Sequence, residues 1–188
     1  MLIPSILYNR FFYVSFFLIV LICSCNNSTH KDEHKSFNKE KVKNQFVKAN
    51  QQVVLKESDE MDYYQKSHKM PFIKTNGGIR YYVYMPSAKG DSLKTDDIVR
   101  INYTVSLLNG TECYSSKIDG IKEFIIGMEN IEDGLHKALL YLKSGDKALV
   151  LIPSHLAHGL LGDSKKIPPM SPIIYDVEII SSKKQQHN

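Results

Sequence analysis

The stretch formed by residues 149–180 constrains the fold of this chain more than any other part of the sequence. It carries a strand-like apolar run at each end, and a long loop with Ile167-Pro168-Pro169 lies between the two runs. Short apolar runs bounded by turn residues are typical of buried β-strands, whereas adjacent prolines cannot continue a strand inside a sheet. The stretch therefore predicts two strands joined by a long loop.

The N-terminus predicts a signal peptide and a location in the bacterial cell envelope. Residues 11–22 form an almost unbroken apolar run, which is too short for a stable membrane span but has the length of a signal-peptide core. The following Ile22-Cys23-Ser24-Cys25 resembles a bacterial lipobox, in which the last cysteine is acylated after cleavage. We expect a signal peptide at residues 1–24 and lipid on Cys25. The alternatives are an ordinary signal peptide cut nearby and an uncleaved membrane helix.

Cysteine content argues against a fold stabilised by disulfides, and net charge argues against a nucleic-acid-binding protein. Of the three cysteines, Cys23 would leave with the signal peptide and Cys25 would carry lipid, so Cys113 would have no partner for a disulfide. The formal net charge of +4 falls by one, to +3, when the signal peptide removes Arg10. This balance is too mild to indicate nucleic-acid binding.

Residues 25–39 are almost entirely polar and charged, so they cannot drive their own folding and are expected to form a tether. Within them, Lys31-Asp32-Glu33 resembles a short signal that directs some bacterial lipoproteins to the cell surface. A solvated charge run is the favoured interpretation of the same residues.

Residues 40–70 predict an amphipathic helix that ends before Pro71. Its apolar stripe is spaced for one helical face, as residues Phe46, Val53, Val54, Met61 and Tyr64 show. We expect the stripe to dock on the domain that follows. The alternative is pairing with a second copy, which would give a homodimer.

Residues 71–183 predict an α+β domain. A hairpin is expected around Asn76-Gly77-Gly78, a strand at residues 97–108, a further strand pair flanking residues 117–120, and one helix at residues 131–143. Strands, one short helix and more strands give a bent antiparallel sheet with the helix laid on one face.

The motifs in this domain occur in the order found in the FKBP family of peptidyl-prolyl isomerases, and the chain resembles that family over about ninety residues. The matching segments are residues 99–104 (VRINYT), 109–116 (NGTECYSS), 124–127 (FIIG), 131–135 (IEDGL), 144–148 (SGDKA), 153–159 (PSHLAHG), 167–169 (IPP) and 175–179 (YDVEI). The helix, the strand that begins at Gly78 and the loop at residues 155–163 further resemble lipoprotein FKBPs of gliding and gut bacteria, including gliding-motility-associated isomerases. The resemblance implies an FKBP-like fold and rotation of X-Pro amides.

This chemistry needs a desolvating cavity and a few fixed hydrogen-bond donors, because the barrier of roughly 18–20 kcal/mol comes from the planar amide ground state. It requires no nucleophile, metal or cofactor, and we expect none. His155 and His158, with His136 and Cys113 elsewhere, are a weak metal signal, since they lack a CxxC motif or a carboxylate partner.

The resemblance also implies a set of site residues. The proline pocket would be lined by Tyr103, Cys113, Phe124, Ile131, Leu135, Ile167 and Tyr175, with Phe124 at or just behind its wall. The catalytic residues would be Tyr103, Tyr114, Glu132, His158 and Tyr175, with the backbone N–H of Glu132 meeting a substrate carbonyl. Phe124 and Ile131 would serve equally well as core residues.

Several positions depart from the family pattern. Leu135 stands where a tryptophan usually forms the pocket floor, and Cys113-Tyr114 replaces Phe-Asp, which removes a carboxylate from the pocket. His158 stands where a tyrosine usually donates to the substrate. Catalysis is therefore expected to be slow or narrow in its choice of substrate.

Two functions remain open from the sequence. The first is an isomerase held by lipid in the bacterial envelope, with proline-containing segments of exported proteins as substrates. The second is a proline-binding or chaperone module with little turnover, which could belong to a motility or secretion assembly. Asn26 after the lipidated cysteine lacks an acidic retention signal, so the outer membrane is the favoured location.

Overall fold

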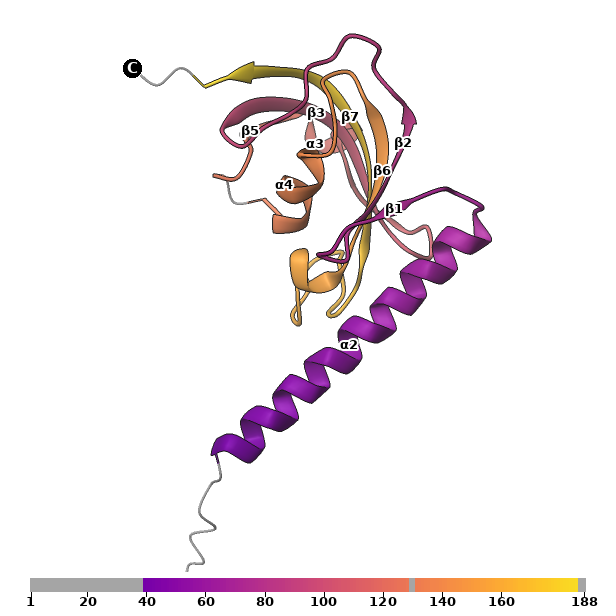
Figure 1. Cartoon of the computed structure of the whole chain (residues 1–188), viewed down its shortest axis with the longest axis vertical. Coiled ribbons are helices and arrows are strands. Elements are labelled where there is room, and N and C mark those ends of the chain that lie inside the picture. The colour runs from indigo at the N-terminus through magenta and orange to yellow at the C-terminus, as the bar shows by residue number, and fades with distance from the viewer. Residues whose placement is uncertain (1–38, 129–130, 186–188) are drawn as a thin grey trace, which may run out of the picture. The chain divides into compact units, whose positions relative to one another are not determined.

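The computed structural model describes residues 39–128 and 131–185 (Figure 1). The expected signal peptide, Cys25 and the tether up to residue 38 lie outside the described residues. Contacts divide the chain into residues 1–39 and residues 40–188, and all described residues except Lys39 belong to the second unit. No helix within the described residues has both the length and the apolar character that a membrane crossing requires.

Helix α2 spans Lys39–Ser67 and ends three residues before the position expected from Pro71. Lys69 adopts the left-handed backbone conformation with a φ of 52°, which cannot continue a helix. Within the last turn, the Ser67 hydroxyl donates to the carbonyl of Tyr64 at 3.0 Å and so satisfies one acceptor at the helix end. A positive-φ residue after the last turn therefore stops the helix before the proline is reached.

A bent antiparallel sheet of seven strands forms the body of the domain (Figure 1). The strands are β1 (Ile73–Lys74), β2 (Arg80–Met85), β3 (Asp97–Leu107), β4 (Glu112–Ser115), β5 (Lys122–Ile125), β6 (Lys147–Ile152) and β7 (Ile173–Lys184). Their order is β1-β2-β6-β7-β3-β4, and β5 pairs with the start of β3, which leaves β4 to pair with its end. The expected hairpin and α+β layout are confirmed, although β1 has only two residues.

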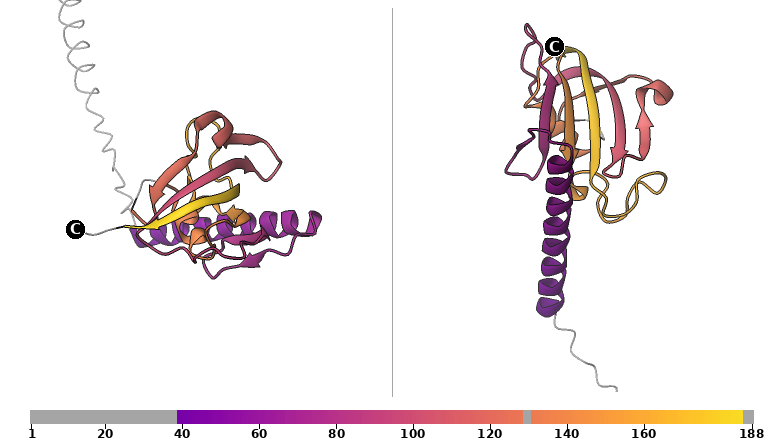
Figure 2. Two further views of the ribbon diagram at one scale, coloured as in Figure 1. Left: turned by 90° about the horizontal axis from the view of Figure 1, so that it is seen from above. Right: turned by 90° about the vertical axis from the view of Figure 1, so that its right-hand side faces the viewer.

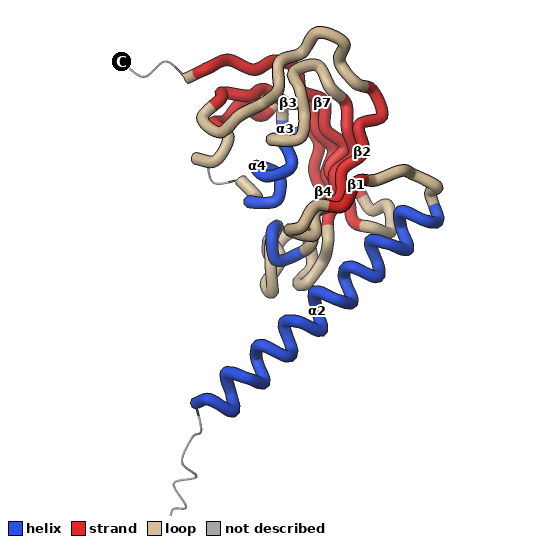
Figure 3. Tube along the Cα trace, viewed as in Figure 1, coloured by secondary structure: helices blue, strands red, loops and turns tan. Residues whose placement is uncertain are grey.

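Short helical segments connect the strands, as Figure 3 shows in blue. They are α3 (Ser116–Asp119), α4 (Asp133–Leu139) and the 3-10 turn η1 (Ser154–Leu156). The sequence predicted α4 at residues 131–143, and this expectation was too long at both ends. After Leu139 the chain tightens into three-residue turns, in which Leu142 N–H donates to the Leu139 carbonyl at 2.9 Å.

The inner face of the sheet carries the main core. Alternate residues of β3 and β7 point to this face, and α4 covers them with Leu135 and Leu139, which are fully buried. Each such side chain contributes about 1.5–3 kcal/mol by leaving water. Gly134 permits the close approach, because a Cβ there would lie 2.2 Å from Cγ2 of Ile152.

A second, smaller core lies on the outer face of the sheet, where the C-terminal half of α2 packs. Figures 1 and 2 show this end of the helix beside the sheet. The core consists of buried Met61 of α2 with Phe72, Leu151 and Ile174. The expected apolar stripe therefore docks only through its C-terminal half. At the other end of the helix Phe46 is 66% exposed and Val54 is 41% exposed.

Candidate functional site

The residues expected to line the pocket meet on the inner face of the sheet. Tyr103 of β3 and Tyr175 of β7 have ring centroids 6.2 Å apart. The strand register explains this contact, because Tyr175 lies opposite Val105 and both tyrosines therefore point to the same face. Leu135 and Ile167 join the same core cluster, and Ile131 packs against it.

These side chains are more deeply buried than the walls of an open pocket would be. Leu135 and Tyr175 are completely covered, while Ile167 and Tyr103 are 3% and 4% exposed. The base of the site is therefore filled by protein. Open volume lies beside it, where Ile131 reaches from the cluster to a surface hollow.

This hollow has a volume of about 420 Å³ and a largely polar lining. It is lined by Lys122, Ile131, Glu132, Asp133, His155, Leu156, Ala157 and His158. Three of the expected site residues, namely Ile131, Glu132 and His158, belong to this set. We refer to it below as the rim hollow.

The side chain of Glu132 joins the buried cluster to the rim hollow. Its Oε2 accepts a hydrogen bond of 2.9 Å from the Tyr175 hydroxyl, and its Oε1 lies 3.1 Å from Nε2 of His158. The His158 contact is an ion-pair distance without hydrogen-bond geometry, and Nε2 is buried without a hydrogen-bond partner among the described residues. Burial, followed by the charge and hydrogen bond of Glu132, raises the pKa of Tyr175, so its hydroxyl stays a donor. The sequence had assigned only the backbone of Glu132.

A carboxylate that the sequence analysis missed lies beside Tyr114. The Tyr114 hydroxyl donates to Oδ2 of Asp163, and Oδ1 accepts the backbone N–H groups of Lys165 and Ile167, each at 2.8 Å. Asp163 thus orients the segment that presents Ile167. A carboxylate therefore does lie at this edge of the site, but it is supplied by the loop. The signal in the sequence is Gly162-Asp163-Ser164, a composition typical of turns in which Asp bonds to nearby backbone.

The hydrogen bonds of this pair shift both pKa values. Partial desolvation raises the pKa of Asp163, but the Tyr114 and backbone hydrogen bonds outweigh it and lower the pKa to about 2. The bond to Asp163, with smaller effects of desolvation and charge, raises the pKa of Tyr114 to about 12. Tyr114 therefore remains a neutral donor to an ionised carboxylate at neutral pH.

The Ser116 side chain fixes the backbone of Tyr103. Ser116 Oγ accepts from the Tyr103 N–H at 3.0 Å and donates to its carbonyl at 3.2 Å. The Lys122 ammonium lies 4.8 Å from the ring centroid, within range of a cation–π contact. Burial, followed by the charges of Asp119 and Glu132, raises the pKa of the Tyr103 phenol.

Cys113 and Phe124 belong to the same buried cluster as Tyr103 and Tyr175. Cys113 is 2% exposed, and burial, followed by the charge of Asp163, raises the pKa of its thiol. Phe124 packs edge-on against His136, whose Nδ1 accepts the Gly127 N–H at 2.9 Å. His136 is thereby committed to the core. Within residues 39–128 and 131–185, no group of three or more His, Cys, Asp or Glu side chains could hold a metal ion.

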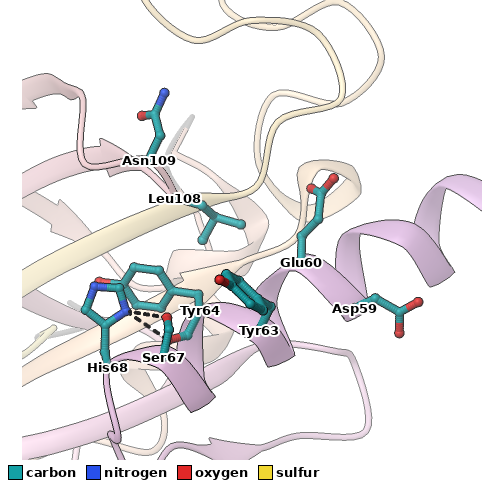
Figure 4. A pocket seen from close by; sticks show the side chains of 8 residues that line it. All are labelled: Asp59, Glu60, Tyr63, Tyr64, Ser67, His68, Leu108 and Asn109. Carbon is teal, nitrogen blue, oxygen red and sulfur yellow. Dashed lines mark hydrogen bonds between the residues drawn. The ribbon is translucent and has the colours of Figure 1, made fainter.

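A separate apolar hollow of about 520 Å³ lies between α2 and the turn after β3 (Figure 4). It is lined by Asp59, Glu60, Tyr63, Tyr64, Ser67, His68, Leu108 and Asn109. Tyr64 and Leu108 pack on the outer-face core, so this hollow lies across the sheet from the expected site residues. None of those residues contributes to it.

The fold is an α+β domain with a site on the inner face of its sheet, and comparison with known proteins identifies the family. Residues 90–180 match the family model described as FKBP-type peptidyl-prolyl cis-trans isomerase. FK506-binding protein 2 of Dictyostelium discoideum is 37% identical over 98 residues, which cover 52% of this chain and 74% of that protein. The chain belongs to the FKBP family of peptidyl-prolyl cis-trans isomerases.

Other relatives match more of the chain. Macrophage infectivity potentiator of Trypanosoma cruzi is 29% identical over 179 residues, covering 93% of this chain and 85% of that protein. FkpA of Escherichia coli is 30% identical over 122 residues, covering 65% of this chain and 44% of FkpA. The chain spans between 16% and 44% of the length of the first curated relatives it matches.

Solved structures agree on the fold. The crystal structure of Escherichia coli FkpA has a TM-score of 0.60 at 24% identity and covers 92% of this chain and 82% of that chain. A peptidyl-prolyl cis-trans isomerase from Pseudomonas syringae has a TM-score of 0.61 at 21% identity and covers 71% of this chain and 96% of that chain.

Proposed function

We propose that this chain is a peptidyl-prolyl cis-trans isomerase that acts on X-Pro bonds of exported proteins. Membership of the FKBP family supports the reaction type. The observation that carries the proposal is the position of Ile131, which packs against the cluster of Tyr103, Leu135 and Tyr175 and also lines the rim hollow. An apolar surface for a prolyl ring is thereby continuous with an open, polar rim.

The proposed mechanism is desolvation and preferential binding of the twisted amide. A planar X-Pro amide is stabilised by resonance, and withdrawing water from it disfavours the charge separation on which that resonance depends. The backbone N–H of Glu132, directly before α4, is the proposed donor to the substrate carbonyl. Preorganised donors of this kind favour the twisted state without a covalent step.

The polar rim gives the candidate site its individual character. Glu132 and His158 stand at the mouth of the site, and Tyr175 is fully covered, so a substrate at the mouth meets these two polar side chains before any part of the buried cluster. We therefore expect slower turnover than from an open apolar pocket, together with sensitivity to the residue that precedes proline.

The test is isomerisation of short proline peptides, measured by protease coupling and by NMR exchange with a form of the protein that begins at Asn26. Peptides that differ only in the residue before proline report selectivity. Acceleration that is lost in Ile131→Ser but kept in Ile118→Ser would support the proposal, since Ile118 is 77% exposed on α3. Rates equal to buffer would contradict it.

A second candidate function is a binding or chaperone module, and the free half of α2 favours it. Four large apolar side chains are exposed there: Phe46 at 66%, Val47 at 46%, Val54 at 41% and Leu55 at 59%. Such a surface fits either an unfolded client or the same surface of a second copy, which would make a homodimer.

Sedimentation and aggregation assays separate these outcomes. The double variant Phe46→Ser, Leu55→Ser should stay monomeric if the surface joins two copies, and should lose client protection if the surface holds clients. Wild-type protein that is monomeric and gives no protection would contradict the second candidate.

We propose further that the protein is a lipoprotein of the bacterial envelope, anchored through Cys25, with the outer membrane favoured. The lipobox-like residues 22–25 and the residue after them, Asn26, support this proposal. Metabolic labelling with a fatty-acid analogue should mark wild-type protein but not Cys25→Ser, and fractionation of the membranes should find the label in the outer one. Unlabelled wild-type protein would contradict the anchor.

A further inference from the structure

A buried carboxylate on α2 holds the rim of the candidate site. Glu57 is 3% exposed, and its Oε2 accepts the backbone N–H of Ser154 at 2.8 Å. Its Oε1 accepts the Ser154 hydroxyl as well. A carboxylate is costly to bury unless hydrogen bonds replace its water, and here Ser154 supplies two donors, although it lies 97 positions away in the sequence.

Ser154 is in turn the fixed point of the segment that carries the rim. It begins η1, where its N–H would have no partner inside the helical turn, and Glu57 caps it. Its carbonyl accepts the N–H groups of Ala157 at 2.9 Å and Gly159 at 2.7 Å. The bonds of Ser154 therefore bracket His158, whose Nε2 lies 3.1 Å from Oε1 of Glu132.

The same segment also packs on the start of α4. A Cβ built at Gly134 would lie 3.0 Å from the carbonyl oxygen of Leu156 and 3.2 Å from its Cβ, so the two backbones are in close contact. A displacement of η1 would therefore move both His158 and the start of α4, where Glu132 lies. The contacts run without a break from α2 to the site.

A second anchor of α2 has no such connection. Arg80 of β2 is 1% exposed and donates through Nε to Oδ1 of Asp62 at 3.0 Å. Its Nη2 donates to the carbonyl of Ser58 at 2.9 Å. These bonds tie the helix to the outer face of the sheet and touch no residue of the rim hollow, so they provide a matched control.

We propose that Glu57 is a positioning residue for the candidate site, through which α2 fixes the rim segment of residues 154–158. The proposal rests on the proposed isomerase function for its catalytic readout. Helix α2 is then part of the candidate site, because loss of the contact between Glu57 and Ser154 releases His158 from its place beside Glu132.

The experiment compares Glu57→Gln and Ser154→Ala with the control Asp62→Asn in the otherwise unchanged full chain. Turnover of proline peptides gives kcat and KM, thermal unfolding gives Tm, and NMR of the His158 ring reports the rim directly. We expect Glu57→Gln to lower kcat/KM about tenfold at a temperature where all variants are folded, because small misplacements of site groups are costly. Asp62→Asn should lower Tm while leaving kcat/KM within about twofold of wild type.

The His158 ring signals should shift in Glu57→Gln and Ser154→Ala and stay in place in Asp62→Asn. The double variant Glu57→Gln, Ser154→Ala should lose no more activity than the worse single variant. Unchanged kcat/KM and unchanged His158 signals in both rim variants would overturn the proposal, as would equal losses in Asp62→Asn. If wild-type protein shows no turnover, the proposed function fails, and the His158 signals alone decide the positioning role. If Glu57→Gln does not fold, Ser154→Ala decides it.

Discussion

The hydroxyl of Tyr175 donates a hydrogen bond of 2.9 Å to Oε2 of Glu132, which joins strand β7 to the start of helix α4. Tyr175 is completely buried, whereas the Glu132 side chain retains 12% of its exposure and faces the rim hollow. A polar contact thus closes the boundary between an apolar cluster and solvent. We expect this boundary to influence which peptides can reach the cluster.

Tyr175→Phe tests this contact while keeping the ring that fills the core. We expect the free energy of unfolding to fall by about 1–3 kcal/mol, because a carboxylate loses one donor in a partly buried place. Peptide selectivity should change as well, since Glu132 is released toward the rim. Denaturant unfolding and peptide turnover measure the two effects.

Tyr84→Phe is the matched control for that variant. The Tyr84 hydroxyl also donates to a carboxylate, Asp176 at 2.8 Å, but Tyr84 is 39% exposed on the outer face. Its loss should cost less than about 0.5 kcal/mol and leave turnover unchanged. Equal effects in the two variants would show that the Tyr175 contact has no special role.

Gly134→Ala should destabilise the domain by about 1–3 kcal/mol through overpacking. The added Cβ would lie 2.2 Å from Cγ2 of Ile152, so α4 or η1 has to move. Gly77→Ala serves as control, because its Cβ would meet only Oγ1 of Thr75 at 3.9 Å. Thermal unfolding of both variants gives the comparison, and an unshifted Tm in Gly134→Ala would contradict the close packing.

The Tyr114–Asp163 pair predicts a pH dependence of stability. The pKa of Asp163 in the folded protein, about 2, lies below the value near 3.9 of an unfolded aspartate. The ionised carboxylate therefore stabilises the fold above about pH 4, and this contribution is lost as the pH falls toward 2. The effect should be small, because the pair is partly exposed to solvent.

The measurement is the loss of Tm between pH 6 and pH 2.5, for wild type and for Asp163→Asn. We expect a smaller loss in the variant, which has no carboxylate to protonate at this position. Asp59→Asn, an exposed position on α2, should lose as much as wild type. A variant that matches wild type would rule out the pair as a source of acid sensitivity.

Asp62→Ala tests the second anchor of α2. It leaves the guanidinium of Arg80, which is 1% exposed, without its carboxylate partner, although the bond to the Ser58 carbonyl remains. We expect a loss of about 1–3 kcal/mol. Glu123→Ala removes the exposed pair with Arg100, at 3.2 Å, and should cost no more than about 1 kcal/mol. Urea unfolding compares the two, and equal losses would contradict the importance of burial.

The main strands and the order of motifs were predictable from the sequence because their signals are local. The alternation of apolar residues along β3 is contained within one segment, and so is the turn at Asn109-Gly110. The segments that carry the candidate site were identified by the same local motifs. Their convergence follows from strand register, which the hydrophobic pattern largely fixes.

Boundaries of the helices were less predictable. Helix α4 ends at Leu139, although apolar residues continue to Leu142, because the chain turns tightly to return to β6. Helix α2 ends before Pro71 because Lys69 takes a positive φ. No glycine or proline marks either end at the position where the helix stops.

The sequence by itself determined the main strands, the turns and the N-terminal helix, since hydrophobic periodicity and turn residues act over a few positions, and the order of its motifs carried the resemblance to the FKBP family. Only the tertiary structure decided which polar side chains meet. Asp163 reaches Tyr114 across 49 positions, and Glu57 reaches Ser154 across 97. Such pairs leave no local pattern in the sequence, because the two partners come from distant segments. The packed fold brings the donors to each carboxylate, so the geometry of the whole domain decides which donors stabilise it.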